Sequence, residues 1–96
     1  MRNPYEIIER PLLTEKTTDL SHFGKYTFRV NKDANKIEIA QAVKAIYRVN
    51  VVKVNTLNVK GKKRRVGRYP EGKTSDWKKA IVTLAAGESI TLFEGL

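Results

Sequence analysis

The stretch VVKVNTLNVKGKKRRVGRYPEGKTSDWKKAIVTL, residues 51–84, holds two β-branched runs separated by a basic segment. Residues 51–59 and 77–84 are rich in valine, isoleucine and threonine, which is typical of strands. Residues 60–79 contain nine lysines and arginines and two acids, a net charge of +7. The stretch therefore predicts two antiparallel strands joined by a long basic hairpin loop over residues 60–78.

The predicted loop is much longer than most hairpin connections, which have about two to five residues. Ordering it would cost roughly 1–2 kcal/mol of conformational free energy per residue. Only Val66 and Tyr69 offer apolar side chains that might offset this cost, and the like charges repel one another. We therefore expect residues 61–73 to be mobile in the free protein and to become ordered on a polyanion.

The clearest helical pattern of the chain covers residues 36–47. Its apolar residues recur at intervals of three and four, as one face of a helix requires. Asn35 and Glu38 resemble a capping box, with Asn in place of the usual Ser or Thr. These signals predict a helix that begins directly after Asn35.

Four weaker patterns complete the list of expected elements. Thr14 is a plausible N-cap of a short helix that ends near Ser21. Residues 26–30 alternate apolar and polar side chains and predict a strand. Residues 5–10 fit either a short strand or a helical turn, and residues 89–93 fit a short strand.

The first β-branched run changes parity along its length. Val52 and Val54 fall on one face of a strand, whereas Leu57 and Val59 fall on the other. A bulge or bend near Thr56 would reconcile the two halves. We expect such an irregularity in this strand.

Taken together, these elements predict an α+β fold with a mainly antiparallel sheet. Two helices pack on the sheet, and the long basic hairpin loop lies between the last two main strands. The chain has 96 residues, close to the size of one compact domain. We expect residues 1–96 to form a single nucleic-acid-binding domain with residues 60–78 as its extended loop.

The composition argues against several classes of protein. The chain has no cysteine and only one histidine, His22, so a thiolate or transition-metal site is not expected. No nucleotide-binding loop, nucleophile motif or acid–base pair of carboxylates stands out. The N-terminus lacks the apolar core of a signal peptide, and no apolar run is long enough to span a bilayer. We predict no enzyme, no cofactor, no membrane insertion and a cytosolic location.

The distribution of charge points to a polyanionic partner. The net charge is +9, of which residues 1–59 contribute +4 and residues 80–96 contribute −2. The excess in residues 60–79 is the electrostatic footprint of nucleic-acid binding. Arginines grip phosphates bidentately, lysines act as point charges, and Tyr69 is suited to stack on an unpaired base. Trp77 fits a core position at a strand start or, alternatively, a base-stacking position.

Other interpretations of the basic segment remain open at this point. A charge run can be a solvated surface, and KKRR resembles a nuclear-import patch. A membrane surface would be bound by an amphipathic helix, which residues 60–73 do not resemble. The alternative from another functional class is a basic adaptor or import-type protein whose loop binds an acidic protein partner.

Several motifs, in order along nearly the whole chain, resemble one known family. The chain is similar to the universal large-subunit ribosomal protein number twenty-three, in its short bacterial or plastid form. The motifs that carry the resemblance are RPLLTEK at 10–16, KYTFRV at 25–30, DANKIEI at 33–39, VVKVNTLNVKGKKRR at 51–65, GR at 67–68 and SDWKKA at 75–80.

The resemblance implies an α+β fold in a structural constituent of the large ribosomal subunit. Members of the family bind the third domain of large-subunit rRNA beside the polypeptide exit tunnel, next to another small ribosomal protein. Their rim is a docking site for nascent-chain factors, including trigger factor and the signal recognition particle. The implied location is the cytoplasmic ribosome, or the plastid stroma for an organellar form.

The resemblance and the charge pattern together give two sets of candidate site residues. Glu15, in the Thr-Glu-Lys motif, matches the family's chaperone-docking residue, although a carboxylate in a first helical turn also simply favours the helix dipole. The candidate rRNA-binding residues are Lys60, Lys62, Lys63, Arg64, Arg65, Arg68, Tyr69, Lys73, Trp77, Lys78 and Lys79.

Overall fold

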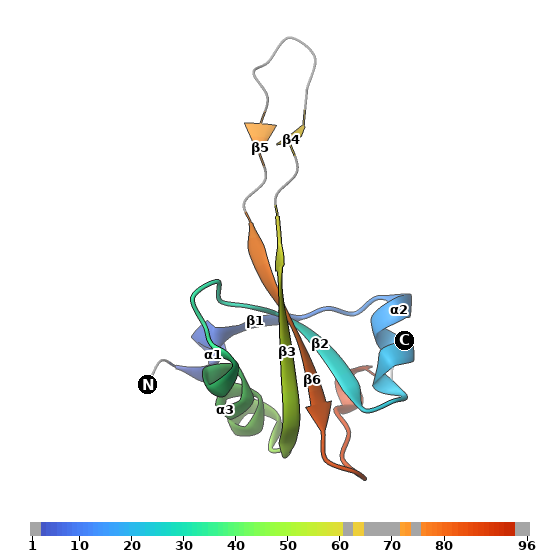
Figure 1. Ribbon diagram of the computed structural model, residues 1–96. Coiled ribbons are helices and arrows are strands. Elements are labelled where there is room, and N and C mark those ends of the chain that lie inside the picture. Colours follow the sequence, from blue (N-terminus) through green and yellow to red (C-terminus); the bar gives the residue numbers. More distant parts are fainter. Residues whose placement is uncertain (1–2, 61–62, 65–71, 74–75, 94–96) are drawn as a thin grey trace.

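An open four-stranded antiparallel sheet forms the centre of the computed structural model (Figure 1). The structure describes residues 3–60, 63–64, 72–73 and 76–93. The strands follow the spatial order β1-β2-β6-β3. Their bounds are β1 Ile8–Pro11, β2 Lys25–Val30, β3 Val51–Val59 and β6 Trp77–Leu84. The α+β prediction is confirmed, and β3 and β6 are adjacent antiparallel strands, as the two β-branched runs predicted.

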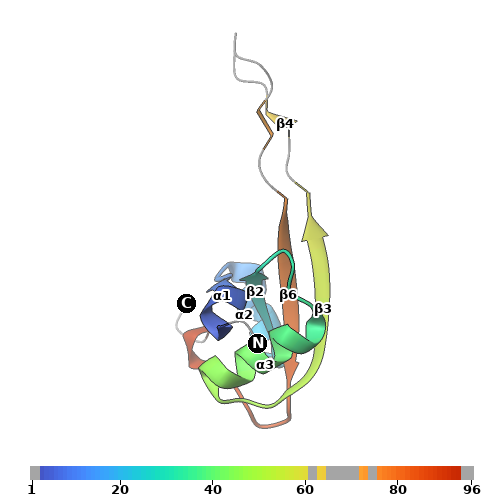
Figure 2. The same cartoon turned by 90° about the vertical axis from the view of Figure 1, so that its left-hand side faces the viewer.

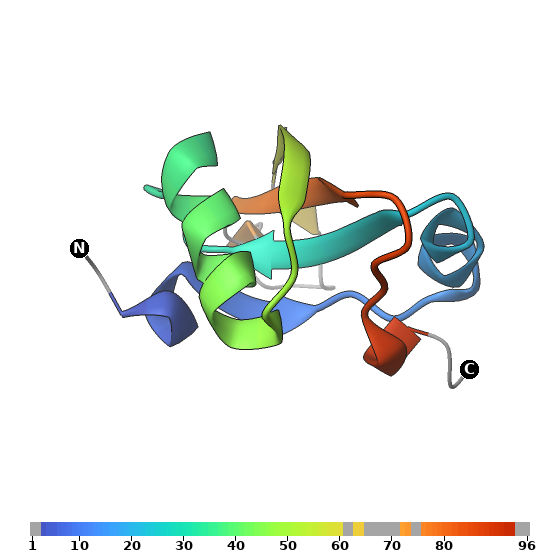
Figure 3. The ribbon, with the colours of Figure 1, turned by 90° about the horizontal axis from the view of Figure 1, so that it is seen from below.

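Three helices accompany the sheet where the sequence predicted two: α1 Pro4–Ile7, α2 Glu15–Ser21 and α3 Lys36–Tyr47. The additional helix, α1, comes from residues 5–10, where a helical turn and a strand were alternatives. Both form in succession, because Asn3 caps a single turn that leads directly into β1. Seen from below, α1 and α3 lie together at one side of the sheet and α2 at the other (Figure 3).

Two capping boxes fix where the longer helices begin. The Asn35 side chain accepts from the Glu38 N–H at 2.8 Å, and the Glu38 carboxylate accepts from the Asn35 N–H. Thr14 caps α2 in the same way, with Thr17 as its reciprocal partner. The predicted start of α3 and the predicted cap of α2 are both confirmed. Since capping is local chemistry, a few adjacent residues are enough to specify it.

The hydrophobic core lies between α1, α3 and one face of the sheet. Tyr26 and Phe28 of β2 are buried there, and Phe93 packs edge-on against both at ring-centroid distances of 5.1 and 5.6 Å. Val82 of β6 and Ile39 of α3 are completely buried in the same cluster. We call this side the core face of the sheet and the opposite side the outer face.

The expected bulge near Thr56 is wrong, because the irregularity lies at the start of β3. Val51 pairs with Leu84 and Lys53 with Thr83, so Val52 is the extra residue, and it is 69% exposed. From Lys53 onward the register is regular. No bend is needed because the apolar residues of the second half of β3 belong to the outer face, which is partly covered by α2.

The predicted strand at residues 89–93 is also wrong. Thr91–Phe93 form a turn of 3-10 helix, η1. Ile90 and Phe93, three residues apart, are 3% and 0% exposed. This spacing places both side chains in the core from a helical turn, which an extended segment would not do.

Two short strands within the basic segment form a separate pair. β4, Lys63–Arg64, pairs antiparallel with β5, Gly72–Lys73. Figures 1 and 2 show this pair beyond the ends of β3 and β6, away from the helices. The other residues of the expected loop, 61–62, 65–71 and 74–75, lie outside the described residues. The expected mobility of residues 61–73 therefore stays a prediction.

Candidate nucleic-acid interface

The outer face carries a row of cations across three neighbouring strands. Arg10 of β1 stands opposite Arg29 of β2, and Arg29 stands opposite Lys79 of β6. Leu57 of β3 completes the row on the far side of Lys79. Residues directly opposite each other on neighbouring strands lie about 4.5–5.5 Å apart, and like charges in such positions repel. A bound anion would relieve this repulsion.

An acid next to Arg10 reaches this row. The Glu9 carboxylate pairs with the Arg29 guanidinium at 3.1 Å, and both side chains are partly exposed. This carboxylate offsets one of the three cations. Arg10, Arg29, Lys79 and Glu9 together therefore carry a net positive charge, at the side of the sheet that faces away from α3.

A second cationic row lies nearer the opposite end of the strands. Lys25 of β2 and Lys53 of β3 both stand opposite Thr83 of β6, and both lysines are exposed. The intervening row, Thr27–Ile81–Asn55, is uncharged. The outer face thus presents cations at both ends of a short neutral strip.

Trp77 belongs to this outer face and not to the core. It is half-buried, and the Arg29 guanidinium carbon lies 5.1 Å from its ring centroid, a cation–π arrangement. The interpretation of Trp77 as a core residue at a strand start is therefore wrong. Its indole is held at the surface by a long-range contact between β2 and β6.

The structure distributes the other candidate rRNA-binding residues over the hairpin and β6. Lys60 is exposed directly after β3. The backbones of Lys63 and Lys73 pair across β4 and β5, and Arg64 pairs with Gly72. Lys62, Arg65, Arg68 and Tyr69 lie outside the described residues.

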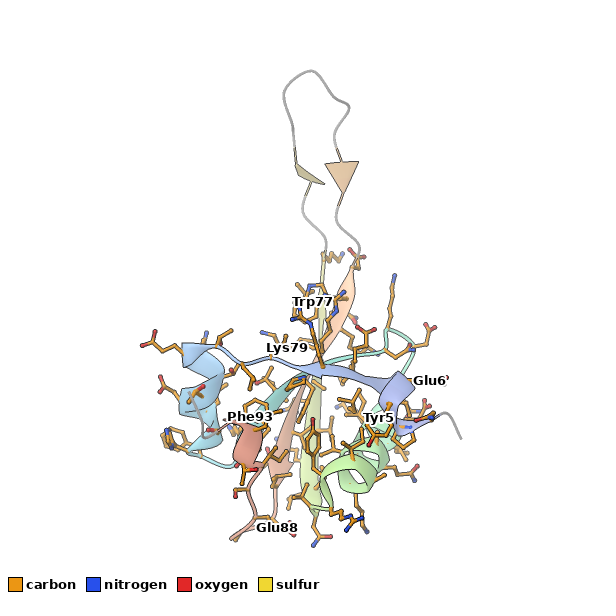
Figure 4. All side chains as sticks on the ribbon, turned by 180° about the vertical axis from the view of Figure 1, so that it is seen from behind. Tyr5, Glu6, Trp77, Lys79, Glu88 and Phe93 are labelled. Carbon is orange, nitrogen blue, oxygen red and sulfur yellow. The ribbon has the colours of Figure 1, made fainter. Side chains whose placement is uncertain are left out.

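Lys78 and Lys79 point to opposite faces of β6. Lys79 joins the outer row described above, and it lies near Trp77 in Figure 4. Lys78 instead donates to the Ala34 carbonyl at 2.8 Å, next to the start of α3. Its ammonium group keeps further donors, but it is tethered to the loop before α3. An RNA contact at Lys78 would therefore approach from the side of α3, and one at Lys79 from the outer face.

Sequence reasoning missed four basic residues of the outer face: Arg10, Lys25, Arg29 and Lys53. A partial signal existed, because Arg29 lies in the predicted strand at 26–30 and Lys25, directly before it, has the same parity. Their alignment with Lys79 depends on the strand order, which a single sequence does not reveal. The interface is consequently broader than the basic hairpin alone.

Glu15 lies on a different part of the molecule. It is exposed in the first turn of α2, beside Leu13, Asp19 and His22 around a shallow pocket. α2 lies beside the sheet, whereas the hairpin extends from the end of the sheet (Figure 1). The structure therefore separates the predicted docking residue from the basic hairpin.

Two negative findings concern only the described part of the chain. Within it, no three His, Cys, Asp or Glu side chains are grouped so that they would hold a metal ion. None of the helices described there has the length and apolar character needed to cross a membrane.

Comparison with known proteins agrees with the motifs. Residues 6–92 match the family model described as Ribosomal protein L23. A relative named Large ribosomal subunit protein uL23 from Roseiflexus sp. strain RS-1 is 56% identical over 93 residues, which cover 97% of this chain and 98% of the relative. Proteins of the same name from Heliobacterium modesticaldum and Treponema denticola are each 51% identical, over 100% and 94% of this chain and 100% and 95% of their own lengths.

Proposed function

The chain belongs to the ribosomal protein L23 family, and from this premise we propose that it binds large-subunit rRNA beside the polypeptide exit tunnel. As a family member it is a structural constituent of the large ribosomal subunit and not an enzyme. The proposal concerns how it attaches there: through the basic hairpin together with the outer face of the sheet.

The observation that carries this proposal is that the basic segment and the cationic outer face are connected through the strand β6. In the chain β4 follows β3 and β5 precedes β6, and β6 brings Trp77 and Lys79 to the outer face. Phosphates bound by the hairpin and by the outer row would belong to one RNA surface. Contacts of this kind fix the position of a protein on RNA and read little sequence.

The proposed RNA contacts are the eleven residues predicted from the sequence together with the basic residues of the outer face. The third domain of the large-subunit rRNA is the proposed target, as the family resemblance implies. Arg10, Lys25, Arg29 and Lys53 extend the contact area from the hairpin onto the sheet.

Salt dependence of binding tests the mechanism. If about six phosphates are neutralised, the logarithm of affinity should fall against the logarithm of salt concentration with a slope of about −4 to −5. The measurement is filter binding of the full chain to a transcript of the third rRNA domain. A slope near zero would refute an electrostatic attachment. Retention of the protein on ribosomal subunits through a high-salt wash would distinguish this function from that of a basic adaptor that binds an acidic protein.

We further propose that α2 offers a docking surface for nascent-chain factors, with Glu15 as its charged contact. The support is the exposure of Glu15 and its distance from the hairpin, which leaves α2 accessible when the hairpin is buried in RNA. Trigger factor and the signal recognition particle are the expected factors, and a neighbouring small ribosomal protein is the expected structural partner.

A further inference from the structure

A groove of about 470 Å³ lies between α2 and the outer face of the sheet. Its border includes Leu20 of α2, Thr27 of β2, Leu57 of β3, and Trp77 and Lys79 of β6. Its volume falls within the range of about 300–1,000 Å³ that small-ligand sites occupy. The groove therefore has room for a flat group of the size of a nucleobase.

The floor of the groove combines apolar side chains with one unpaired hydroxyl. Ile81 stands opposite Thr27 in the register of β2 and β6. Thr27 is 1% exposed, and its hydroxyl oxygen has no hydrogen-bond partner in the part of the chain that the structure describes. Because this oxygen is buried beneath the surface of the groove, the floor offers a bound group mainly apolar contacts.

The rim of the groove is apolar on one side and cationic on the other. Leu57 is 52% exposed and borders the groove. Lys79 is half-buried and Lys16 is exposed, and both border the groove. Trp77 presents its indole here while Arg29 holds the ring in place.

We propose that this groove holds one unstacked nucleotide of the large-subunit rRNA, an inference that rests on the proposed function. The base packs against Trp77 and Leu57, and a flanking phosphate lies at Lys79 and Lys16. Single-stranded RNA is commonly recognised by stacking of splayed bases on aromatic side chains.

Charge complementarity selects a nucleotide over an apolar peptide. The surface around the groove carries the outer row Arg10–Arg29–Lys79 and the exposed Lys25 and Lys53. A peptide segment would fill the apolar floor but leave these cations without counter-charges. A nucleotide within an RNA strand supplies both the flat apolar group and the phosphates.

The chain contains a natural reporter for this binding event. Trp77 is its only tryptophan, so the indole fluorescence reports on the surroundings of this one ring. Titration of the full chain with a transcript of the third rRNA domain should quench this fluorescence, because a base stacks against the ring. The quenching curve should follow the binding curve measured by filter retention.

A matched pair of charge variants separates the groove from general electrostatics. Leu57→Glu places a carboxylate at the groove, whereas Val52→Glu places one on the bulge of the same strand, outside the groove. Both side chains are more than half exposed and both substitutions remove one unit of net charge. Leu57→Glu should weaken RNA binding at least about tenfold more than Val52→Glu and abolish most of the quenching.

Four outcomes would overturn the inference. RNA binding with a normal salt slope but without quenching of Trp77 would show that the groove stays empty of RNA while the proposed function holds. Equal affinities of Leu57→Glu and Val52→Glu would have the same meaning. Quenching by intact subunits but not by the transcript would assign the groove to a protein. Failure of the wild type to bind the transcript would instead refute the proposed function, and the nucleotide site with it.

Discussion

The core face and the outer face of the sheet are built from alternate residues of the same strands, yet the two faces differ in burial and in charge. Phe28 and Val82, on the core face, are completely buried. On the outer face, Arg29 follows Phe28 directly and Lys79 lies three residues before Val82. Both remain partly exposed and carry positive charge. One set of positions stabilises the fold, and the other presents cations to an external partner.

The difference between the faces also protects the strand register. Because side chains alternate, a slip of one residue would move Arg29 and Lys79 into the core and expose Phe28 and Val82. Burial of unpaired cations is far more costly than the loss of any surface contact. The cationic outer face therefore contributes to the uniqueness of the fold, even though its like charges repel in the folded state.

The largest expected effect comes from the core face. Phe28→Ala should lower the free energy of unfolding by about 3–5 kcal/mol, because the Phe28 ring packs against Phe93 and Tyr47. A chain of this size has about 5–14 kcal/mol in total. Urea denaturation followed by circular dichroism measures the change. Leu57→Ala on the outer face is the control and should cost less than about 1 kcal/mol; equal losses would mean that the two faces do not differ as described.

The second prediction concerns the outer face, where substitutions should weaken RNA binding and leave stability unchanged. The double variant Arg10→Gln, Lys79→Gln should keep the stability of the wild type or exceed it, since two members of a repelling row are removed. Its RNA affinity should fall, and the salt slope should become shallower by about two, one for each lost phosphate contact. Lys44→Gln, an exposed lysine of α3 on the other side of the sheet, should leave the slope unchanged. An unchanged slope in the double variant would remove the outer row from the interface.

The contrast between the faces also explains which features the sequence predicted. The bounds of α3 and β6 follow from patterns within a few residues, namely the Asn35–Glu38 box and the β-branched run after Trp77. The alternation of apolar and polar residues in β2 was also visible in the sequence. Local chemistry specified these elements, so reading the chain in order was enough to find them.

Features that depend on the pairing of distant strands were not predictable. The outer row requires Arg10, Arg29 and Lys79 to meet across β1, β2 and β6. The surface position of Trp77 depends on its contact with Arg29, which comes from another strand. The bulge was predicted at the wrong position because the sequence did not show that α2 partly covers the outer face, to which Leu57 belongs.

The third prediction separates stability from binding through a cap that touches neither face of the sheet. Asn35→Ala should lower the free energy of unfolding by about 1 kcal/mol, since the first turn of α3 loses a side-chain acceptor. Thermal denaturation measures the change, and Asn35→Asp should restore most of it. The salt slope of RNA binding should match the wild type; a shallower slope would mean that α3 takes part in the interface.

The smallest expected effect on the folded chain comes from Glu15, the proposed docking contact in the first turn of α2. Glu15→Gln removes the carboxylate from the first turn of α2 and should cost about 0.3–1 kcal/mol through the helix dipole. RNA affinity and salt slope should not fall, because a negative charge has been removed. Recruitment of trigger factor to ribosomes that carry the variant should nevertheless weaken, since the docking contact loses its charge.

Co-sedimentation of trigger factor with such ribosomes is the measurement. Glu6→Gln is the matched control, because Glu6 is an exposed acid in the first turn of α1, on the side of the molecule opposite α2 (Figure 4). The two variants have the same net charge, so a loss of recruitment confined to Glu15→Gln would assign the effect to α2. Equal recruitment of trigger factor by ribosomes with either variant would mean that Glu15 only stabilises the start of α2 through the helix dipole. The docking site would then lie on another surface of the protein.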